Sequence, residues 1–170
     1  VKALNGTALA SAVTRTFTTG AADSTVPAIA FVNADDFGFA ITFSEPVNAA
    51  KATDTINWPT SVLNPATYDV IKYHNVVGFD PVTLGTVIPL TNTTLSYDAP
   101  SNTVLIEGLA GASYIGQEVY ISMDTTGSNA AKDLSGNVIT TAGNTGRVTV
   151  ANSATTKGAL GPMAMSTDAF

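Results

Sequence analysis

Residues 40–47 read Ala-Ile-Thr-Phe-Ser-Glu-Pro-Val, and this stretch decides how the rest of the chain is interpreted. From Ile41 to Ser44 the side chains alternate between apolar and polar, which is typical of a strand with one buried face. Pro46 ends the run, because proline has no N–H to donate to a neighbouring strand. The stretch therefore predicts a half-buried β-strand that leads into a turn.

Runs of strand length recur along the chain, with turn residues between them and no sustained helical periodicity. Only residues 48–57 combine Ala and Lys in a way that predicts a helix, of one or two turns at most. This spacing predicts an all-β fold, an antiparallel β-sandwich. The expected strands are 13–19, 28–32, 37–43, 67–73, 76–79, 86–90, 94–97, 103–107, 118–123 and 147–150.

The composition favours a subunit that lives beside other copies. A chain of 170 residues is long enough for one well-filled core, or for one domain and a fragment of another. Hydrophobic residues make up 45% of the chain and charged residues only 12%, about half the usual charged share. Because so few charges repel neighbouring copies, an array or filament fits this chain better than a free monomer.

The charge balance and the residue types exclude several partners and chemistries. The chain has 7 Lys and Arg against 13 Asp and Glu, a net charge of −6, and no basic cluster, which argues against nucleic acid. No apolar run approaches the roughly 18–20 residues that would span a membrane. There is no cysteine, so disulfides, thiolate metal sites and cysteine nucleophiles are excluded together.

A sequence pattern that occurs twice divides the chain. Residues 133–137 read Asp-Leu-Ser-Gly-Asn and precede an Arg-centred strand, and residues 3–7 stand in the same relation to the Arg-centred run at 14–18. Residues 1–20 are therefore predicted to be a strand segment, either a donor strand or the last strand of a preceding repeat. A lone strand cannot bury its apolar face and must pair with something. A linker at 21–27, a sandwich at 28–151 and a tail at 152–170 follow.

Three motifs together resemble the bacterial Ig-like domains of S-layer proteins and surface adhesins. They are Phe-Ser-Glu-Pro-Val at 43–47, Asp-Leu-Ser-Gly-Asn at 133–137, and Phe-Thr-Thr-Gly at 17–20 with its linker through Asp23 to Pro27. The resemblance covers roughly residues 13 to 150. It implies an Ig-like Greek-key sandwich with a detached N-terminal strand, in a structural or adhesive protein outside the cytoplasm. Residues 74–93 and 124–129 are longer than the pattern leads us to expect.

One candidate site is a Ca²⁺ loop around Asp133. Asp133, Ser135 and Asn137 place oxygen-bearing side chains at alternate positions, as the start of a Ca²⁺ loop does. Val138 stands where an EF-hand needs Gly, so an EF-hand is rejected. A simpler oxygen cage closed by Glu45, or by Asp35–Asp36, stays open, beside the alternative of a turn in which Gly136 supplies a positive φ.

A second candidate site is the junction between repeats. Asp23, together with Asp35 and Asp36, could hold a cation there, because a bound cation relieves the repulsion between neighbouring carboxylates. The alternative is a solvated loop, since Asp is common in turns. Ca²⁺ is the only cofactor that the residues suggest.

No constellation for catalysis can be assembled, and the chain is predicted not to be an enzyme. His74 is the only histidine, and it lacks an identifiable nucleophile and orienting partner. Ser113 misses the Gly-x-Ser-x-Gly spacing by one residue. Glu45, Glu107 and Glu118 could act in glycoside hydrolysis only at a defined separation, which the sequence does not give.

The functional prediction is therefore assembly. We expect a secreted or surface-displayed structural subunit of a surface layer or filament, whose strand at 13–19 adds to a sheet edge of another copy or of a neighbouring Ig-like repeat. Its assembly residues are predicted to be Val13, Arg15, Phe17 and Thr19. The alternative is an adhesin or ligand-binding Ig-like module that takes a surface glycan or a protein.

Overall fold

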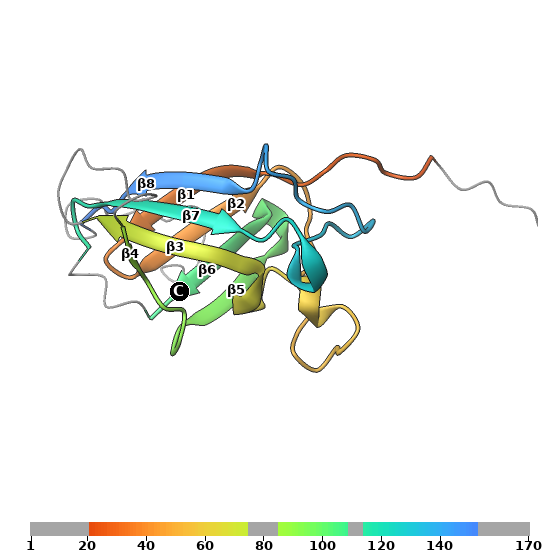
Figure 1. Ribbon diagram of the computed structural model, residues 1–170, viewed down its shortest axis with the longest axis horizontal. Helices are drawn as coiled ribbons and strands as arrows, with labels where there is room; N and C mark the ends of the chain where they lie inside the picture. Colours follow the sequence, from red (N-terminus) through yellow and green to blue (C-terminus); the bar gives the residue numbers. More distant parts are fainter. Residues whose placement is uncertain (1–20, 75–84, 109–113, 153–170) are drawn as a thin grey trace, which may run out of the picture.

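Two antiparallel sheets of four strands each form a β-sandwich in the computed structural model, which describes residues 21–74, 85–108 and 114–152 (Figure 1). One sheet has the order β1-β2-β6-β5 and the other the order β4-β3-β7-β8. The predicted all-β class and sandwich architecture are confirmed. The strands are β1 (Ile29–Asp35), β2 (Gly38–Phe43), β3 (Tyr68–His74), β4 (Thr86–Val87), β5 (Thr94–Asp98), β6 (Thr103–Glu107), β7 (Glu118–Met123) and β8 (Thr145–Thr149).

Short 3-10 turns connect some of these strands. They are η1 (Trp58–Thr60), η2 (Pro65–Thr67), η3 (Ala99–Ser101) and η5 (Gly127–Asn129). Within the described ranges no helix is long and apolar enough to cross a membrane.

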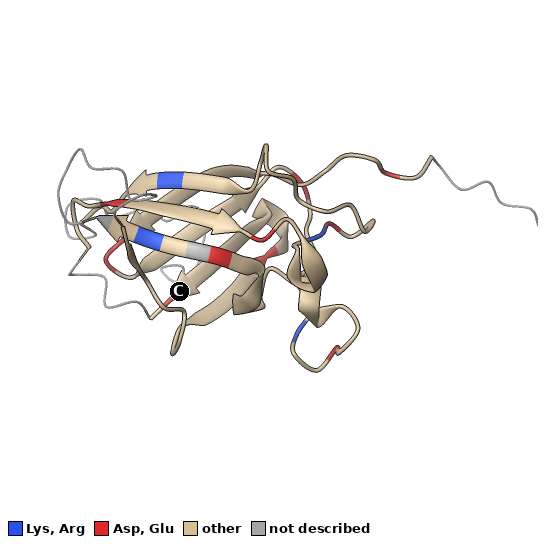
Figure 2. Cartoon of the chain, viewed as in Figure 1, with Lys and Arg blue, Asp and Glu red and all other residues tan. Residues whose placement is uncertain are grey.

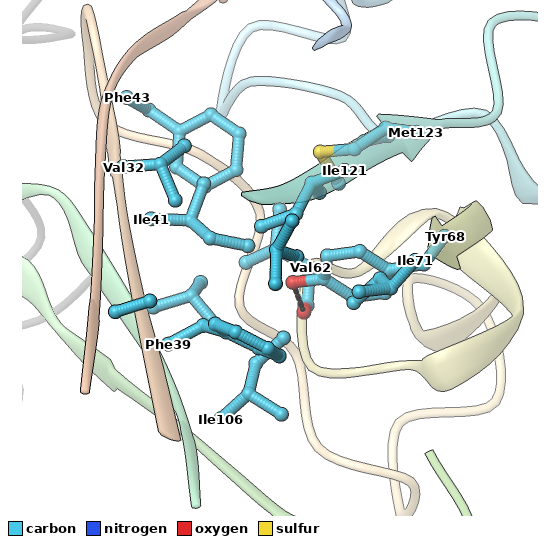
Figure 3. Packing of buried hydrophobic residues seen from close by; sticks show 14 of the residues in the cluster. Val32, Phe39, Ile41, Phe43, Val62, Tyr68, Ile71, Ile106, Ile121 and Met123 are labelled. Carbon is cyan, nitrogen blue, oxygen red and sulfur yellow. Dashed lines mark hydrogen bonds between the residues drawn. The ribbon is translucent and has the colours of Figure 1, made fainter. Parts of the chain in front are cut away.

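The core lies between the sheets, and β2 supplies its centre. Phe39, Ile41 and Phe43 alternate along β2 and are almost fully buried. Figure 3 shows them pointing toward side chains of the opposite sheet, among them Ile121. On the other face of β2, the hydroxyl groups of Thr42 and Thr103 lie 2.9 Å apart. The predicted strand is present with its apolar alternate residues facing the core, but the prediction of a single buried face is wrong, because Ala40 on the other face is also buried and β2 lies between β1 and β6.

The sandwich is closed along one side by contact between β1 and β8. The Ala151 N–H donates to the Ala34 carbonyl at 2.9 Å, and the Ile29 N–H donates to the Gly143 carbonyl at 2.7 Å. Gly146 permits the approach, since a Cβ at that position would lie 2.4 Å from Val32 Cγ2. On the other side, β4 and β5 are the outermost strands of their sheets.

The predicted helix at 48–57 is wrong, because this segment forms turns instead. The Asp54 carboxylate accepts hydrogen bonds from the backbone N–H groups of Ile56, at 3.2 Å, and Asn57, at 3.1 Å. Such local side-chain bonds compete with helical ones. The strand expected at 86–90 is also shorter than predicted. It ends at Val87, two residues before Pro89.

Some sequence predictions lie outside the described residues. These are the strand at 13–19 with its assembly residues Val13, Arg15, Phe17 and Thr19, the strand at 76–79, and the tail beyond residue 152.

Candidate metal centre

The candidate site lies at the end of the sandwich where the linker meets the first strand. The Ser44 N–H donates to the Ala28 carbonyl at 2.9 Å, and the Ala28 N–H donates to Ser44 Oγ at 3.0 Å. The turn after β2 is also held to the loop before β8, because Val47 forms a β-bridge with Asp133. Three segments distant in sequence therefore meet here.

Each of these segments contributes one carboxylate to an acidic cluster, which we define as Asp23, Glu45 and Asp133. Their nearest carboxylate oxygens all lie within 4.8 Å of one another. Asp23 belongs to the exposed linker, Glu45 is partly buried, and Asp133 is only 4% exposed. Oxygen atoms at this spacing and of this charge are what a hard divalent cation such as Ca²⁺ prefers.

Asp133 is fixed by the loop that follows it. Its Oδ1 accepts hydrogen bonds from the N–H groups of Ser135, at 2.8 Å, and Asn137, at 2.7 Å. Its Oδ2 accepts a third, from Asn137 Nδ2 at 2.7 Å. Gly136 has a φ of 94°, a region in which residues other than glycine are strained. The predicted capped turn with a positive φ at Gly136 is confirmed.

Asn137 ties the loop to the linker. Its Nδ2 also donates to the Asp23 carbonyl oxygen at 3.2 Å. Because the same amide nitrogen donates to Asp133 Oδ2, Asn137 links the Asp133 carboxylate to the backbone of the linker. The structure therefore brings Asn137 to the site in a supporting role, with Ser135 on the same turn.

The electrostatics of the cluster are unfavourable without a counter-charge. Partial burial raises the pKa of Glu45 above its usual value, and the negative charges of Asp23 and Asp133 raise it further. Glu45 Oε1 is buried and has no hydrogen-bond partner among the residues that the structure describes. The pKa of Asp23 is lowered by hydrogen bonds from Thr25, whose backbone N–H lies 2.9 Å from Asp23 Oδ1. A cation among the three carboxylates would supply the missing partner for Glu45.

The structure does not bring Asp35 and Asp36 into the cluster. They lie at the β1–β2 hairpin, where Asp35 pairs with Gly38, whereas the start of β1 pairs with Phe43. Asp35 Oδ1 instead caps the hairpin, accepting from the Phe37 N–H at 2.8 Å and the Gly38 N–H at 3.3 Å. The two antiparallel strands thus separate this Asp pair from Glu45 by the length of β1.

A polar groove beside Asp133 was not anticipated from the sequence. It has a volume of about 550 Å³ and lies between the 48–60 segment and the Asp133 loop, with Lys132 in its lining. Two apolar side chains that line it are largely exposed, Ile56 at 85% and Leu134 at 75%. No local pattern signals such a groove, because the two loops are joined by long-range contacts. These are the bridge between Val47 and Asp133 and the bonds of Lys132, whose carbonyl accepts from the Asn48 N–H at 2.8 Å and whose N–H donates to the Thr60 carbonyl at 3.3 Å.

No protein-family model matches the chain, and no match was found among curated proteins or solved structures.

Proposed function

We propose that this chain is an extracellular structural module of Ig-like, Greek-key type, which assembles into a surface layer or filament and whose N-terminal junction is held by Ca²⁺. The observation that carries the proposal is the acidic cluster, because Asp23 comes from the linker while Glu45 and Asp133 come from the sandwich. A site shared between a module and the segment before it serves the connection between modules.

The strand order supports the Ig-like part of the proposal. In immunoglobulin-type sandwiches one sheet has the order A-B-E-D and the other contains C-F-G, extended by C′ in some members. If β1 to β8 are labelled A, B, C, C′, D, E, F and G, the observed orders become A-B-E-D and C′-C-F-G. The outermost strand C′ is here the two-residue β4.

The proposed role of the cation is to join the linker to the sandwich. Residues 21–26 are exposed, and the contacts of the linker with the sandwich end include the bonds to Asn137 and Ser44. Three carboxylates within 4.8 Å repel one another, and a cation turns that repulsion into attraction. With Ca²⁺ bound, the linker would leave the sandwich in one direction, whereas without Ca²⁺ the repulsion would loosen it.

Assembly itself is proposed to use strand addition by residues 13–19. Val13, Arg15, Phe17 and Thr19 alternate along this run, and backbone hydrogen bonds to an exposed sheet edge would provide the pairing. Each sheet has one outermost strand on the open side of the sandwich, β5 and β4. The low charge of the chain favours close approach of copies.

A ligand-binding module is the alternative, and one surface favours it. The register places Lys72, Tyr120 and Arg147 in a row across β3, β7 and β8. Such a row suits an acidic glycan or an acidic protein surface. The Arg147 guanidinium, however, lies 5.4 Å from the centre of the Tyr120 ring and 3.3 Å from Glu118 Oε1, so the aromatic face is already in use. The structural role therefore has the stronger support.

The test compares the full chain with a variant that lacks residues 1–20, each with Ca²⁺ and with a chelator, by size-exclusion chromatography and electron microscopy. We expect ordered assemblies of the full chain that are strengthened by Ca²⁺, and monomers of the shortened chain. Equal assembly of both chains would overturn strand addition. The cation site is tested by thermal melting of the full chain with Ca²⁺ and with chelator. Equal melting temperatures would overturn it.

A further inference from the structure

An open groove lies along the first residues of β3, on the side where β4 leaves the sheet. It has a volume of about 480 Å³. Its lining includes the buried side chains of Tyr68, Ile71 and Ile88 and the half-exposed side chain of Val87. Asp69 is exposed and is the only charged residue among the described residues that line the groove. The groove is thus mostly apolar with one carboxylate.

The groove runs beside a backbone edge that β4 leaves unpaired. β4 pairs only with Lys72 and Tyr73, and the Ile88 N–H then donates to the Ile71 carbonyl at 2.7 Å. Within the described ranges, no strand pairs with Tyr68 or Asp69 on this side. Figure 1 shows the chain turning away from β3 after β4 toward β5. The Tyr68 N–H already donates to the Pro65 carbonyl, so the edge that stays open to another strand is short and lies at Asp69.

The pattern of residues 13–19 complements this groove. The run reads Val-Thr-Arg-Thr-Phe-Thr-Thr, so in an extended conformation Val13, Arg15 and Phe17 share one face. Two apolar side chains with a cation between them match a mostly apolar groove whose described lining carries the carboxylate of Asp69. Few other basic side chains could pair with the Asp69 carboxylate, because the whole chain has only 7 Lys and Arg residues.

We propose that this groove receives residues 13–19 of a second copy of the chain, with Arg15 paired to Asp69 and Phe17 in the apolar part of the groove. The inference rests on the proposed strand addition and names its acceptor. A second copy is favoured over the same chain because residues 21–26 are exposed and lead away from the sandwich at its end (Figure 1). Twenty residues precede Ala21, enough to carry such a strand to a neighbour.

Charge reversal provides the first test, with the full chain and its critical concentration for assembly as the readout. Arg15→Asp and Asp69→Arg should each raise that concentration roughly threefold or more, since an exposed ion pair becomes a repulsion. The double variant should return to within roughly twofold of the unaltered chain. Asp98→Arg, on the edge strand β5 of the other sheet, is the matched control and should change nothing. An effect of Asp98→Arg in place of Asp69→Arg would overturn the assignment of the groove.

Disulfide trapping provides the second test. Because the chain has no cysteine of its own, the introduced thiols are the only ones that can form a disulfide. Oxidised Arg15→Cys/Asp69→Cys should give a ladder of covalent oligomers, whereas Arg15→Cys/Ser96→Cys, which probes β5, should give none. A ladder only from the Ser96 pair would overturn the groove but keep strand addition. A cross-linked monomer would overturn the second copy as occupant. A full chain that stays monomeric at every concentration would overturn the proposed function itself.

Discussion

Two aspartates, Asp133 and Asp54, make the same set of hydrogen bonds in different surroundings. Asp54 Oδ1 accepts from two backbone N–H groups, and its Oδ2 accepts from Asn57 Nδ2 at 2.8 Å, as Asp133 does with Asn137. The bonds of Asp54 are exposed, whereas Asp133 is buried. Because water can replace exposed bonds but not buried ones, the two loops should differ in their contribution to stability.

We therefore predict that Asp133→Ala lowers the free energy of unfolding by roughly 2–3 kcal/mol, because it leaves the N–H groups of its loop without acceptors. Asp54→Ala, the matched control, should cost about 1 kcal/mol or less. Urea denaturation in the presence of chelator measures both. Equal losses would show that burial of the Asp133 loop does not matter.

The pH dependence of Glu45 can be predicted from the direction of its pKa shift. A raised pKa means that the folded protein holds this proton more tightly than the unfolded chain, whose carboxyl keeps its usual value near 4.5. With chelator, ionised Glu45 therefore costs stability above its folded pKa, and that cost disappears as the pH falls through this pKa toward 4.5. With Ca²⁺, protons compete with the cation and the trend reverses.

The measurement is the difference in melting temperature between the unaltered chain and Glu45→Gln, followed from neutral pH downward. With chelator we expect Glu45→Gln to be more stable near neutral pH and the difference to shrink as the pH falls. With Ca²⁺ the unaltered chain should be the more stable. Glu107→Gln, at the opposite end of the sandwich, is the control. A difference that does not change with pH would contradict the shift.

At the scale of elements, the contact between β1 and β8 depends on small residues. A Cβ on Gly146 would meet Val32 Cγ2 at 2.4 Å and Ile29 Cγ2 at 3.2 Å, and a Cβ on Gly143 would meet that of Ala28 at 2.4 Å. Such distances require backbone or side-chain shifts in a packed interior. The two glycines therefore set how closely the sheets meet on this side.

We predict that Gly146→Ala lowers the free energy of unfolding by about 1–3 kcal/mol through overpacking. Thr145→Ala, an exposed neighbour on the same strand, should change it by less than about 0.5 kcal/mol. Chemical denaturation of both variants is the measurement. A neutral Gly146→Ala would mean that β8 can move away from β1 at no cost.

The strands could be predicted from sequence where the local pattern was sufficient. β6 and β7 begin and end where the alternation places them, since Val104 and Ile121 face the core. The helix at 48–57 failed because Asp54 forms turn bonds that composition does not reveal. β4 ends at Val87 because the chain turns away there toward β5, and the local sequence pattern does not reveal where this turn begins.

The sequence was enough to name the three acidic residues of the candidate site, but not to predict that they lie together. Asp23, Glu45 and Asp133 were each named from the sequence, but Asp23 was grouped with Asp35 and Asp36. Which carboxylates meet is decided by the antiparallel pairing of β1 and β2, which sends the two ends of a hairpin apart. This long-range register is not contained in any local motif.

At the scale of the whole molecule, the core of the described residues lies between the two sheets of the sandwich. The buried cluster and the side chains packed against it, taken over the described part of the chain, begin at Ile29. Figure 2 shows that charged residues are sparse over the visible face, in keeping with their 12% share. Folding and assembly should therefore be separable in this protein.

Deletion of residues 1–20 is predicted to leave the melting temperature within about 3 °C of that of the full chain when both are measured as monomers, since every core residue in the described ranges is kept. Differential scanning calorimetry at low protein concentration measures this. A large loss would mean that the deleted segment packs onto its own sandwich.

The parallel contact of β1 and β8 has a mechanical consequence. Ile29 lies beside Gly143, and Ala34 lies beside Ala151, so the chain enters the sandwich at one end and reaches residue 151 at the other. A pull on the two ends of the sandwich acts along both strands in opposite directions. The bonds between them are then loaded in shear and must break together, so the sandwich resists tension along its length better than a force that peels one strand at a time.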